Sequence, residues 1–229
     1  MMIYAAAGIF VLLVVVVVLV ARRRRGARGI NRDSVPPTTQ DITVVFTNLT
    51  DSIGMFERLG DVIAAKIISD YRAALAPAIR ENGGIINKFM GDGVMAIFGA
   101  PVPDHDHAAH AVVAVLAMQH AIDSLNERLI SEGKTVIRMR VGVATGLAVV
   151  GDVGFRDAAE YGALGDIVNL AMRLQELNKS TGTRNLMSDV TAARLNGDYK
   201  LTEVKVPNGS LRGAEPGPHR AFEVVSMKE

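Results

Sequence analysis

The sequence contains no cysteine, only 5% of its residues are aromatic, and its formal net charge is +1. Without cysteine, neither a disulfide nor a thiolate metal site contributes to stability. The nearly balanced charge gives no polyanion-binding signature, and the body lacks the basic, aromatic surface typical of nucleic-acid-binding modules. With 229 residues, the chain fits one domain plus an appendage, or at most two small domains.

An apolar run occupies Met1 to Val20, with the Tyr4 hydroxyl as its only polar side-chain tip. As a helix rising about 1.5 Å per residue, it would span about 30 Å, the thickness of the hydrocarbon core of a membrane. A cleaved signal peptide carries its basic residues before the apolar run, whereas six arginines follow this one between positions 22 and 32. The order favours an uncleaved, single-pass membrane anchor with the rest of the chain in the cytoplasm.

Residues 21–40 are predicted to form a basic linker, because Pro36-Pro37 opposes a continuous helix into the next domain. Beyond it, apolar β-branched runs predict strands at 42–46, 85–89, 94–98, 136–144, 148–153, 201–206 and 221–225. Helical patterns cover 51–82 with a break near Gly60, 106–129 and 166–181. Strands outnumber those of a simple βαβ alternation, so we expect an α+β domain with a largely antiparallel sheet.

Two hairpins are predicted from turn residues. Asp92-Gly93 is a strong hairpin signal between the strands at 85–89 and 94–98, and taken alone it indicates only a tight turn. The strands at 136–144 and 148–153 are predicted to form a second hairpin across Thr145 to Leu147.

The run Asp104 to His110 holds three histidines and two aspartates. A transition-metal site is one interpretation, but no second group of ligands is identifiable from spacing. The start of the long helix is the favoured interpretation, since aspartate is a preferred residue there.

The segment from Asn82 to Gly99, which contains Asn87-Lys88-Phe89-Met90-Gly91-Asp92-Gly93, closely resembles the central hairpin of the class III adenylate and guanylate cyclases. A second block, Tyr161 to Leu174, resembles their other signature, and Val44 to Thr50 is similar to their first metal-binding strand. The resemblance covers about Ile42 to Val225, and several motifs in the right order are more specific than any one alone. It implies a ferredoxin-like cyclase fold, with a mainly antiparallel sheet flanked by helices, after one transmembrane helix. Residues 41–229 would then form the nucleotide cyclase catalytic domain.

The resemblance implies that the ribose 3′-oxygen of ATP attacks the α-phosphate, giving 3′,5′-cyclic AMP and pyrophosphate. Two divalent ions, Mg²⁺ or Mn²⁺, suit this reaction and require oxygen ligands. Asp92 matches one of the family's two metal-binding aspartates, Asn48 stands where the other is expected, and Leu49 would add its backbone carbonyl.

The resemblance also assigns substrate contacts. Asn169 matches the residue that orients the ribose, and Arg173 matches the arginine that stabilises charge on the phosphates. These two residues are four apart on a helix, so both project from one face. Without the resemblance, they would indicate only a solvated helix surface. Lys88 matches the position that reads the purine, and a lysine there donates to adenine N1, which favours ATP over GTP. Arg212 aligns with a basic residue that contacts the triphosphate.

Four residues depart from the family pattern. Asn48 lacks the charge of aspartate, which lowers metal affinity. Asp51 replaces a glycine, where its carboxylate would either repel the triphosphate or partly replace the missing ligand. Ile53 replaces a threonine, and Gly162 replaces the polar residue that helps to read the purine.

Two hypotheses follow from these matches and departures. The first is an adenylate cyclase of reduced activity at the membrane, and the second is a catalytically impaired domain that binds nucleotide or regulates another cyclase chain. Family members build the site between two chains, so we expect a head-to-tail homodimer, or a heterodimer with another cyclase chain.

Overall fold

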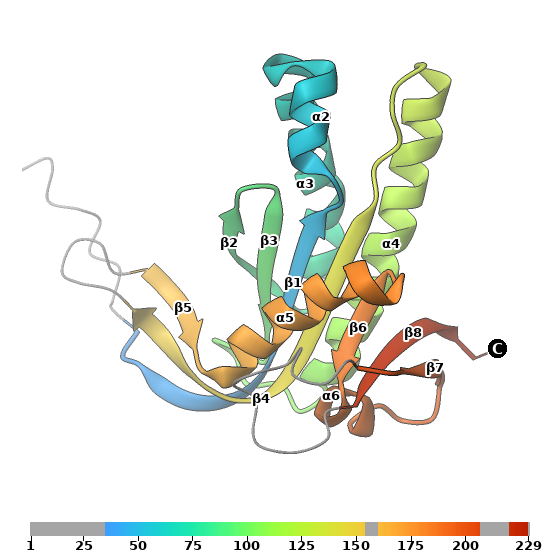
Figure 1. Cartoon of the computed structure of the whole chain (residues 1–229). Coiled ribbons are helices and arrows are strands. Elements are labelled where there is room, and N and C mark those ends of the chain that lie inside the picture. Colours follow the sequence, from blue (N-terminus) through green and yellow to red (C-terminus); the bar gives the residue numbers. More distant parts are fainter. Residues whose placement is uncertain (1–34, 154–159, 207–219, 229) are drawn as a thin grey trace, which may run out of the picture. The chain divides into compact units, whose positions relative to one another are not determined.

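The computed structural model describes residues 35–153, 160–206 and 220–228 (Figure 1). The strands are β1 (Thr38–Leu49), β2 (Ile85–Met90), β3 (Gly93–Phe98), β4 (Met139–Val153), β5 (Glu160–Leu164), β6 (Asn185–Ser188), β7 (Tyr199–Val204) and β8 (Ala221–Met227). The helices are α2 (Ser52–Leu59), α3 (Asp61–Glu81), α4 (His107–Ser131), α5 (Asp166–Thr181) and α6 (Asp189–Ala193). The predicted membrane anchor and Arg212 lie outside the described residues.

The strands form one sheet in the order β2-β3-β1-β4-β6-β8-β7, with β5 paired to β4. Every strand pair is antiparallel except β4 with β6. This arrangement confirms the predicted α+β class with a mainly antiparallel sheet. The first strand is longer than predicted: β1 begins at Thr38, which pairs with Val150, so the sheet includes the last three residues of the predicted linker.

The predicted second hairpin across Thr145 to Leu147 is wrong, because β4 runs without a break from Met139 to Val153. Its partner β1 is long enough to pair with the whole stretch, including Ile42 opposite Gly146. Gly146 does not end the strand. A Cβ atom there would lie 2.9 Å from Cγ2 of Ile167, so glycine lets α5 approach the strand closely.

Alternate residues of the central strand face two different cores. Val45 and Leu49 of β1 belong to a first core, packed against α3 and α4. Val44 and Phe46 belong to a second core, packed against Leu174 and other residues of α5. In Figure 1, α5 crosses β1 and β4 on the opposite side of the sheet from α3 and α4. The period-2 alternation of a strand therefore decides which helix layer each side chain meets.

Helix α4 is long and apolar enough to cross a membrane by length and composition alone. Ala111, Val115 and Met118 on this helix are nevertheless fully buried in the first core. A buried core helix explains this composition.

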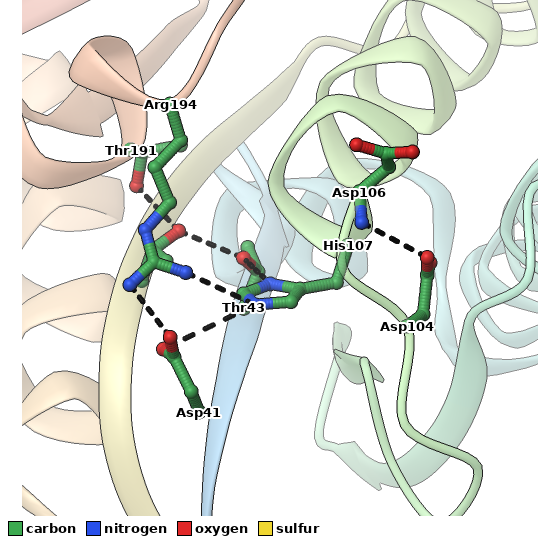
Figure 2. A network of polar contacts seen from close by, with 8 residues as sticks. Asp41, Thr43, Asp104, Asp106, His107, Thr191 and Arg194 are labelled. Carbon is green, nitrogen blue, oxygen red and sulfur yellow. Dashed lines mark hydrogen bonds and ion pairs between the residues drawn. The ribbon is translucent and has the colours of Figure 1, made fainter.

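The polar side chains at the start of α4 form hydrogen bonds and ion pairs with other residues of the chain (Figure 2). His107 is buried, and its Nδ1 lies 2.7 Å from Oγ1 of Thr43. Its Nε2 lies 3.2 Å from Nη1 of Arg194, whose Nη2 is 2.7 Å from Oδ2 of Asp41. Thr43 continues the network to Thr145, at 2.7 Å between the two hydroxyl oxygens. The network ties α4, β1, β4 and the end of α6 together.

The run from Asp104 to His110 does open the helix, as favoured from the sequence. Asp104 accepts a hydrogen bond from the Asp106 backbone N–H at 3.0 Å, and its other carboxylate oxygen lies 2.6 Å from Nδ1 of His110. Asp106 precedes the first helical residue but makes no side-chain cap. Within the described ranges, no group of three His, Cys, Asp or Glu residues is arranged to hold a metal ion.

Acid is expected to destabilise the fold through His107. Burial lowers the pKa of His107 below its ordinary value of 6.5; the charge of Asp41 opposes this shift and that of Arg194 adds to it. The unfolded chain therefore protonates His107 more readily than the folded chain does. The contribution of neutral, buried His107 to stability is present above about pH 6.5 and is lost as the pH falls. Urea unfolding from about pH 7.5 to about pH 5.5 should show a smaller decline for His107→Asn than for the wild type. His110→Asn, at an exposed histidine, is the control; equal declines in all three proteins would contradict the prediction.

The contact between α5 and β4 should tolerate no side chain at Gly142. A Cβ atom there would lie 2.0 Å from the carbonyl oxygen of Ala171 and 2.3 Å from the backbone nitrogen of Gln175. We expect Gly142→Ala to lower the free energy of unfolding by about 3 kcal/mol, because backbone atoms of α5 must move. Gly197→Ala, where a Cβ meets nothing within 4 Å, is the control in the same urea titration. Equal stability of the two variants would disprove this account of the packing.

Candidate active site

Asn48 and Asp92 lie at the same end of the sheet. The β1–β3 ladder ends with Thr47 opposite Val94, so Asn48 follows on one strand and Asp92 lies just beyond the other. Oδ1 of Asn48 and Oδ2 of Asp92 are both buried without a hydrogen-bond partner among the described residues. Buried oxygens without donors are costly, and hard divalent cations prefer oxygen ligands. Each of the two oxygens therefore suits a divalent cation as a ligand.

The hairpin forms where the Asp92-Gly93 signal predicts it, between the strands before and after the turn. Met90 pairs with Gly93, so the two loop residues are Gly91 and Asp92. The left-handed conformation falls on Gly91, with φ of +59°. Gly93 is already in β3, where a Cβ atom would lie 2.6 Å from the carbonyl oxygen of Thr47. The two glycines thus serve different purposes, one for the turn and one for close strand packing.

Helix α3 holds the hairpin tip from the first-core side. Arg72 donates a hydrogen bond from Nη2 to the carbonyl oxygen of Gly91, and its guanidinium carbon lies 4.7 Å from the centre of the Phe89 ring. The Tyr71 hydroxyl donates to Oγ1 of Thr47 at 2.8 Å. Burial raises the pKa of Tyr71; the bond to Thr47 opposes the rise, and the charge of Asp92 adds to it. The phenol therefore remains a donor at neutral pH.

A pocket of about 500 Å³ lies beside Asp92, between the hairpin tip and helices α2 and α3. Ser52, Ile53, Phe56 and Arg72 contribute to its lining. The space adjoins Asp92, so a ligand bound there has room to extend toward the start of α2.

Asp51 occupies a position that suits glycine. It precedes α2 with φ of +60° and ψ of +38°, the left-handed conformation that side chains disfavour, and no other described residue except glycine has positive φ. Its carboxylate does not cap the helix; Oδ2 lies 2.9 Å from Nη1 of Arg58, and both side chains are more than half exposed. The carboxylate is therefore paired with Arg58 and partly neutralised.

Helix α5 presents the two residues matched to ribose and phosphate contacts. It spans Asp166–Thr181, as predicted, with Asn169 exposed and Arg173 half-buried. Within the part of the chain that the structure describes, neither side chain has a hydrogen bond or ion pair, and no contact joins them to Asn48 or Asp92. A single chain thus places Asn48 and Asp92 at the same end of the sheet, but it shows no contact between them and Asn169 or Arg173 among the described residues.

Lys88 reaches the second-core side of the sheet because β2 contains a β-bulge. Ile86 pairs with Ala96 and Lys88 pairs with Met95, so Asn87 is an extra residue between them. Directly paired residues of an antiparallel ladder point to the same face. Met95 belongs to the second core, so Lys88 projects toward the α5 face, whereas Phe89 projects toward α3. Lys88 itself is exposed.

The other two predicted site residues in the described ranges, Gly162 and Leu49, are buried and packed against neighbouring residues. Gly162 is buried in β5 opposite Gly151, and a Cβ atom there would lie 2.9 Å from Cγ2 of Val153. The Leu49 side chain is 3% exposed and packs in the first core, opposite Met139.

Arg140 is a candidate that the sequence analysis missed. It pairs with Asn48 across β1 and β4, so the two side chains share a face. Its Nε atom is buried without a hydrogen-bond partner among the described residues. A guanidinium beside Asn48 fits an anion bound at this end of the sheet. The signal in the sequence was a charged residue within an apolar, β-branched strand.

The candidate site thus holds an amide oxygen and a carboxylate oxygen at one end of the sheet, with Arg140 paired to Asn48. Residues 35–221 match the family described as the adenylate and guanylate cyclase catalytic domain, and the chain belongs to that family. It is a class III nucleotidyl cyclase domain with bacterial homologues, and domains of this family work as dimers and generally use two divalent metal ions.

The curated relatives include adenylate cyclases. Adenylate cyclase 1 of Rhizobium meliloti (strain 1021) is 35% identical over 155 residues, which is 68% of this chain and 23% of that protein. The adenylate cyclase of Anabaena cylindrica is 32% identical over 162 residues, 69% of this chain and 31% of that protein. The chain thus spans less than a third of these two curated relatives.

Solved structures share the fold. The guanylyl cyclase Cya2 superimposes with a TM-score of 0.74 at 28% identity, covering 84% of this chain and 95% of that one. The adenylyl cyclase CyaB from P. aeruginosa gives 0.75 at 24% identity, covering 85% and 98%. Because proteins named for either nucleotide have this fold, the fold alone does not choose between ATP and GTP.

The hairpin tip should loosen when its contact with Arg72 is removed. Arg72→Met keeps an unbranched side chain over Phe89 but removes the donor to Gly91. We expect amide hydrogen exchange at Asp92 and Gly93 to accelerate about tenfold, the effect of one lost hydrogen bond. Lys66→Met, at an exposed lysine of α3 that pairs with Asp70, is the control. Unchanged exchange in Arg72→Met would show that the tip is rigid without this bond.

Proposed function

We propose that the domain is an adenylate cyclase, converting ATP to 3′,5′-cyclic AMP and pyrophosphate at a dimer interface. The supporting observation is the pair of unpartnered oxygens at Asn48 and Asp92, with Lys88 on the α5 face of the neighbouring hairpin strand. Oxygen ligands suit a metal-bound triphosphate, and a lysine donor suits adenine N1.

In the proposed reaction the ribose 3′-oxygen forms a bond to the α-phosphorus, and the bond from that phosphorus to the leaving pyrophosphate breaks. Asn169 orients the ribose. Arg173 and Arg140 donate hydrogen bonds to phosphate oxygens as charge shifts toward the pyrophosphate, a role suited to a fixed guanidinium fork. Arg212 is proposed as a further triphosphate contact. The 3′-hydroxyl proton leaves to solvent or to a substrate phosphate oxygen.

Asp92, Asn48 and the Leu49 carbonyl are the proposed metal ligands. Two bound Mg²⁺ or Mn²⁺ ions would lower the pKa of the 3′-hydroxyl and balance charge on the triphosphate. Asn48 contributes an oxygen without a charge, so affinity for the ions depends mainly on Asp92.

Assembly is proposed to complete the site. Asn169 and Arg173 have no side-chain partner in the described chain, and a second subunit arranged head to tail would bring its own Asn48 and Asp92 to them. A homodimer gives two equivalent sites, and a heterodimer with another cyclase chain gives one or two. We further propose that Met1 to Val20 anchors the protein in a membrane, with the catalytic domain in the cytoplasm.

A second candidate function is a catalytically impaired partner that binds nucleotide or regulates another cyclase chain. The neutral Asn48 favours it, together with the loss of a purine-reading side chain at Gly162.

Restoring the acidic ligand separates the two candidates. We expect the wild-type chain to form cyclic AMP with Mn²⁺ and more slowly with Mg²⁺, and Asn48→Asp to raise the Mg²⁺ rate about tenfold or more through the added charge. Asn196→Asp, which adds the same charge at an exposed loop residue, is the control. Cyclic AMP formed by Asn48→Asp but not by the wild type would support the catalytically impaired partner. Cyclic AMP formed by neither protein would exclude the adenylate cyclase.

A further inference from the structure

The extra residue of the β2 bulge has an amide whose orientation is fixed. Nδ2 of Asn87 donates a hydrogen bond to the backbone carbonyl oxygen of Tyr161 in β5, at 2.5 Å. A carbonyl oxygen only accepts, so the amide must turn its NH₂ group toward β5 and its oxygen away. That oxygen, Oδ1, is buried and has no hydrogen-bond partner among the described residues. The bulge therefore presents a fixed, unpaired acceptor.

This acceptor borders the space left by Gly162. The nearest polar atoms to a Cβ built at Gly162 are Nδ2 and Oδ1 of Asn87, each at 3.9 Å. Gly162 replaces the polar residue that the family uses with Lys88 to read the purine. The Asn87 amide thus lies beside the place where that side chain would begin.

Asn87 and Lys88 are consecutive, and the bulge places both on the α5 face of the sheet. Lys88 shares the face of Met95, and Asn87 bonds to β5, whose Tyr161 packs against the second core. Together they offer one acceptor, Oδ1, and one donor, Nζ. An adenine ring offers the complement, a donor in its exocyclic 6-amino group and an acceptor in N1. Guanine presents an acceptor at C6 and a donor at N1, the reverse order.

We propose that Asn87 is a specificity-determining residue, whose Oδ1 accepts a hydrogen bond from the 6-amino group of adenine while Lys88 donates to N1. This assignment rests on the proposed function, because it requires a purine nucleotide beside Lys88. An asparagine free to rotate would accept or donate equally well. The bond to Tyr161 prevents the rotation, so the site selects adenine against guanine.

The test compares two nucleotides that differ only at the proposed contact. The 3′-deoxy forms of ATP and of purine riboside 5′-triphosphate cannot cyclise, and the second lacks the 6-amino group while keeping N1. Dissociation constants are measured by calorimetry with Mn²⁺ on the wild-type chain and on Asn87→Ala. The wild type should bind the adenine form about tenfold more tightly, the effect of one hydrogen bond to an otherwise unpaired buried acceptor. In Asn87→Ala the ratio should fall to about one.

Asn82→Ala is the matched control, because it removes another half-buried amide, one that bonds to the Ala78 carbonyl at the end of α3. It should keep the wild-type ratio. If Asn87 only supported the hairpin, Asn87→Ala would weaken both nucleotides equally and leave the ratio unchanged, which would overturn the proposal. A wild-type ratio of about one would overturn it as well.

The same proteins distinguish this proposal from the proposed function. The binding ratio does not depend on turnover, so a wild type that discriminates between the analogues but forms no cyclic AMP from ATP would refute the enzyme and support the role of Asn87. A wild type that binds neither analogue would refute both.

Discussion

The long antiparallel ladder between β1 and β4, from Thr38 opposite Val150 to Leu49 opposite Met139, is the constraint on which the other parts depend. One end of it carries Asn48 beside Arg140, and its middle, where Thr43 pairs with Thr145, carries the His107 network that ties in α4 and α6. Gly142 of β4 lies between these two places and has no side chain, so α5, the helix bearing Asn169 and Arg173, is positioned by contact with the backbone of the strand. Because strand, helix and hairpin share this ladder, the geometry of the site is determined by main-chain pairing more than by contacts between functional side chains.

The parts of the fold that local sequence determines were predictable. Helix α5 has the predicted bounds, because its pattern of apolar residues lies within the helix itself. The break between α2 and α3 falls at Gly60, as predicted, because this glycine has a φ of +76° that helical residues do not adopt. The continuity of β4 through Gly146 was not predictable, since it depends on a partner strand about a hundred residues away. Strands β5 and β6 were missed for the same reason: each is short and is defined by its pairing with β4 instead of by its own pattern.

In the candidate site, too, local motifs were predictable and features that depend on strand pairing were not. Asp92, Asn48 and Lys88 were identified from motifs, and the structure adds the buried, unpaired oxygens that give the first two a chemical reason to bind a cation. The side of the sheet that Lys88 faces was not derivable, because strict alternation from Ile86 would direct it toward α3, and only the bulge reverses that. Arg140 was missed because its significance comes from the strand opposite it.

The bulge also bears on how this strand can change over evolutionary time. Asn87 is the one residue of β2 without a partner on β3, and the pairs on either side of it, Ile86 with Ala96 and Lys88 with Met95, are consecutive in a regular ladder. Loss of Asn87 from the gene would therefore shorten the strand without shifting any pair or displacing Asp92. Insertions and deletions within strands normally move every following side chain to the opposite face. Here a single codon separates two hairpins of identical register, one with the unpaired amide oxygen of Asn87 and one without it.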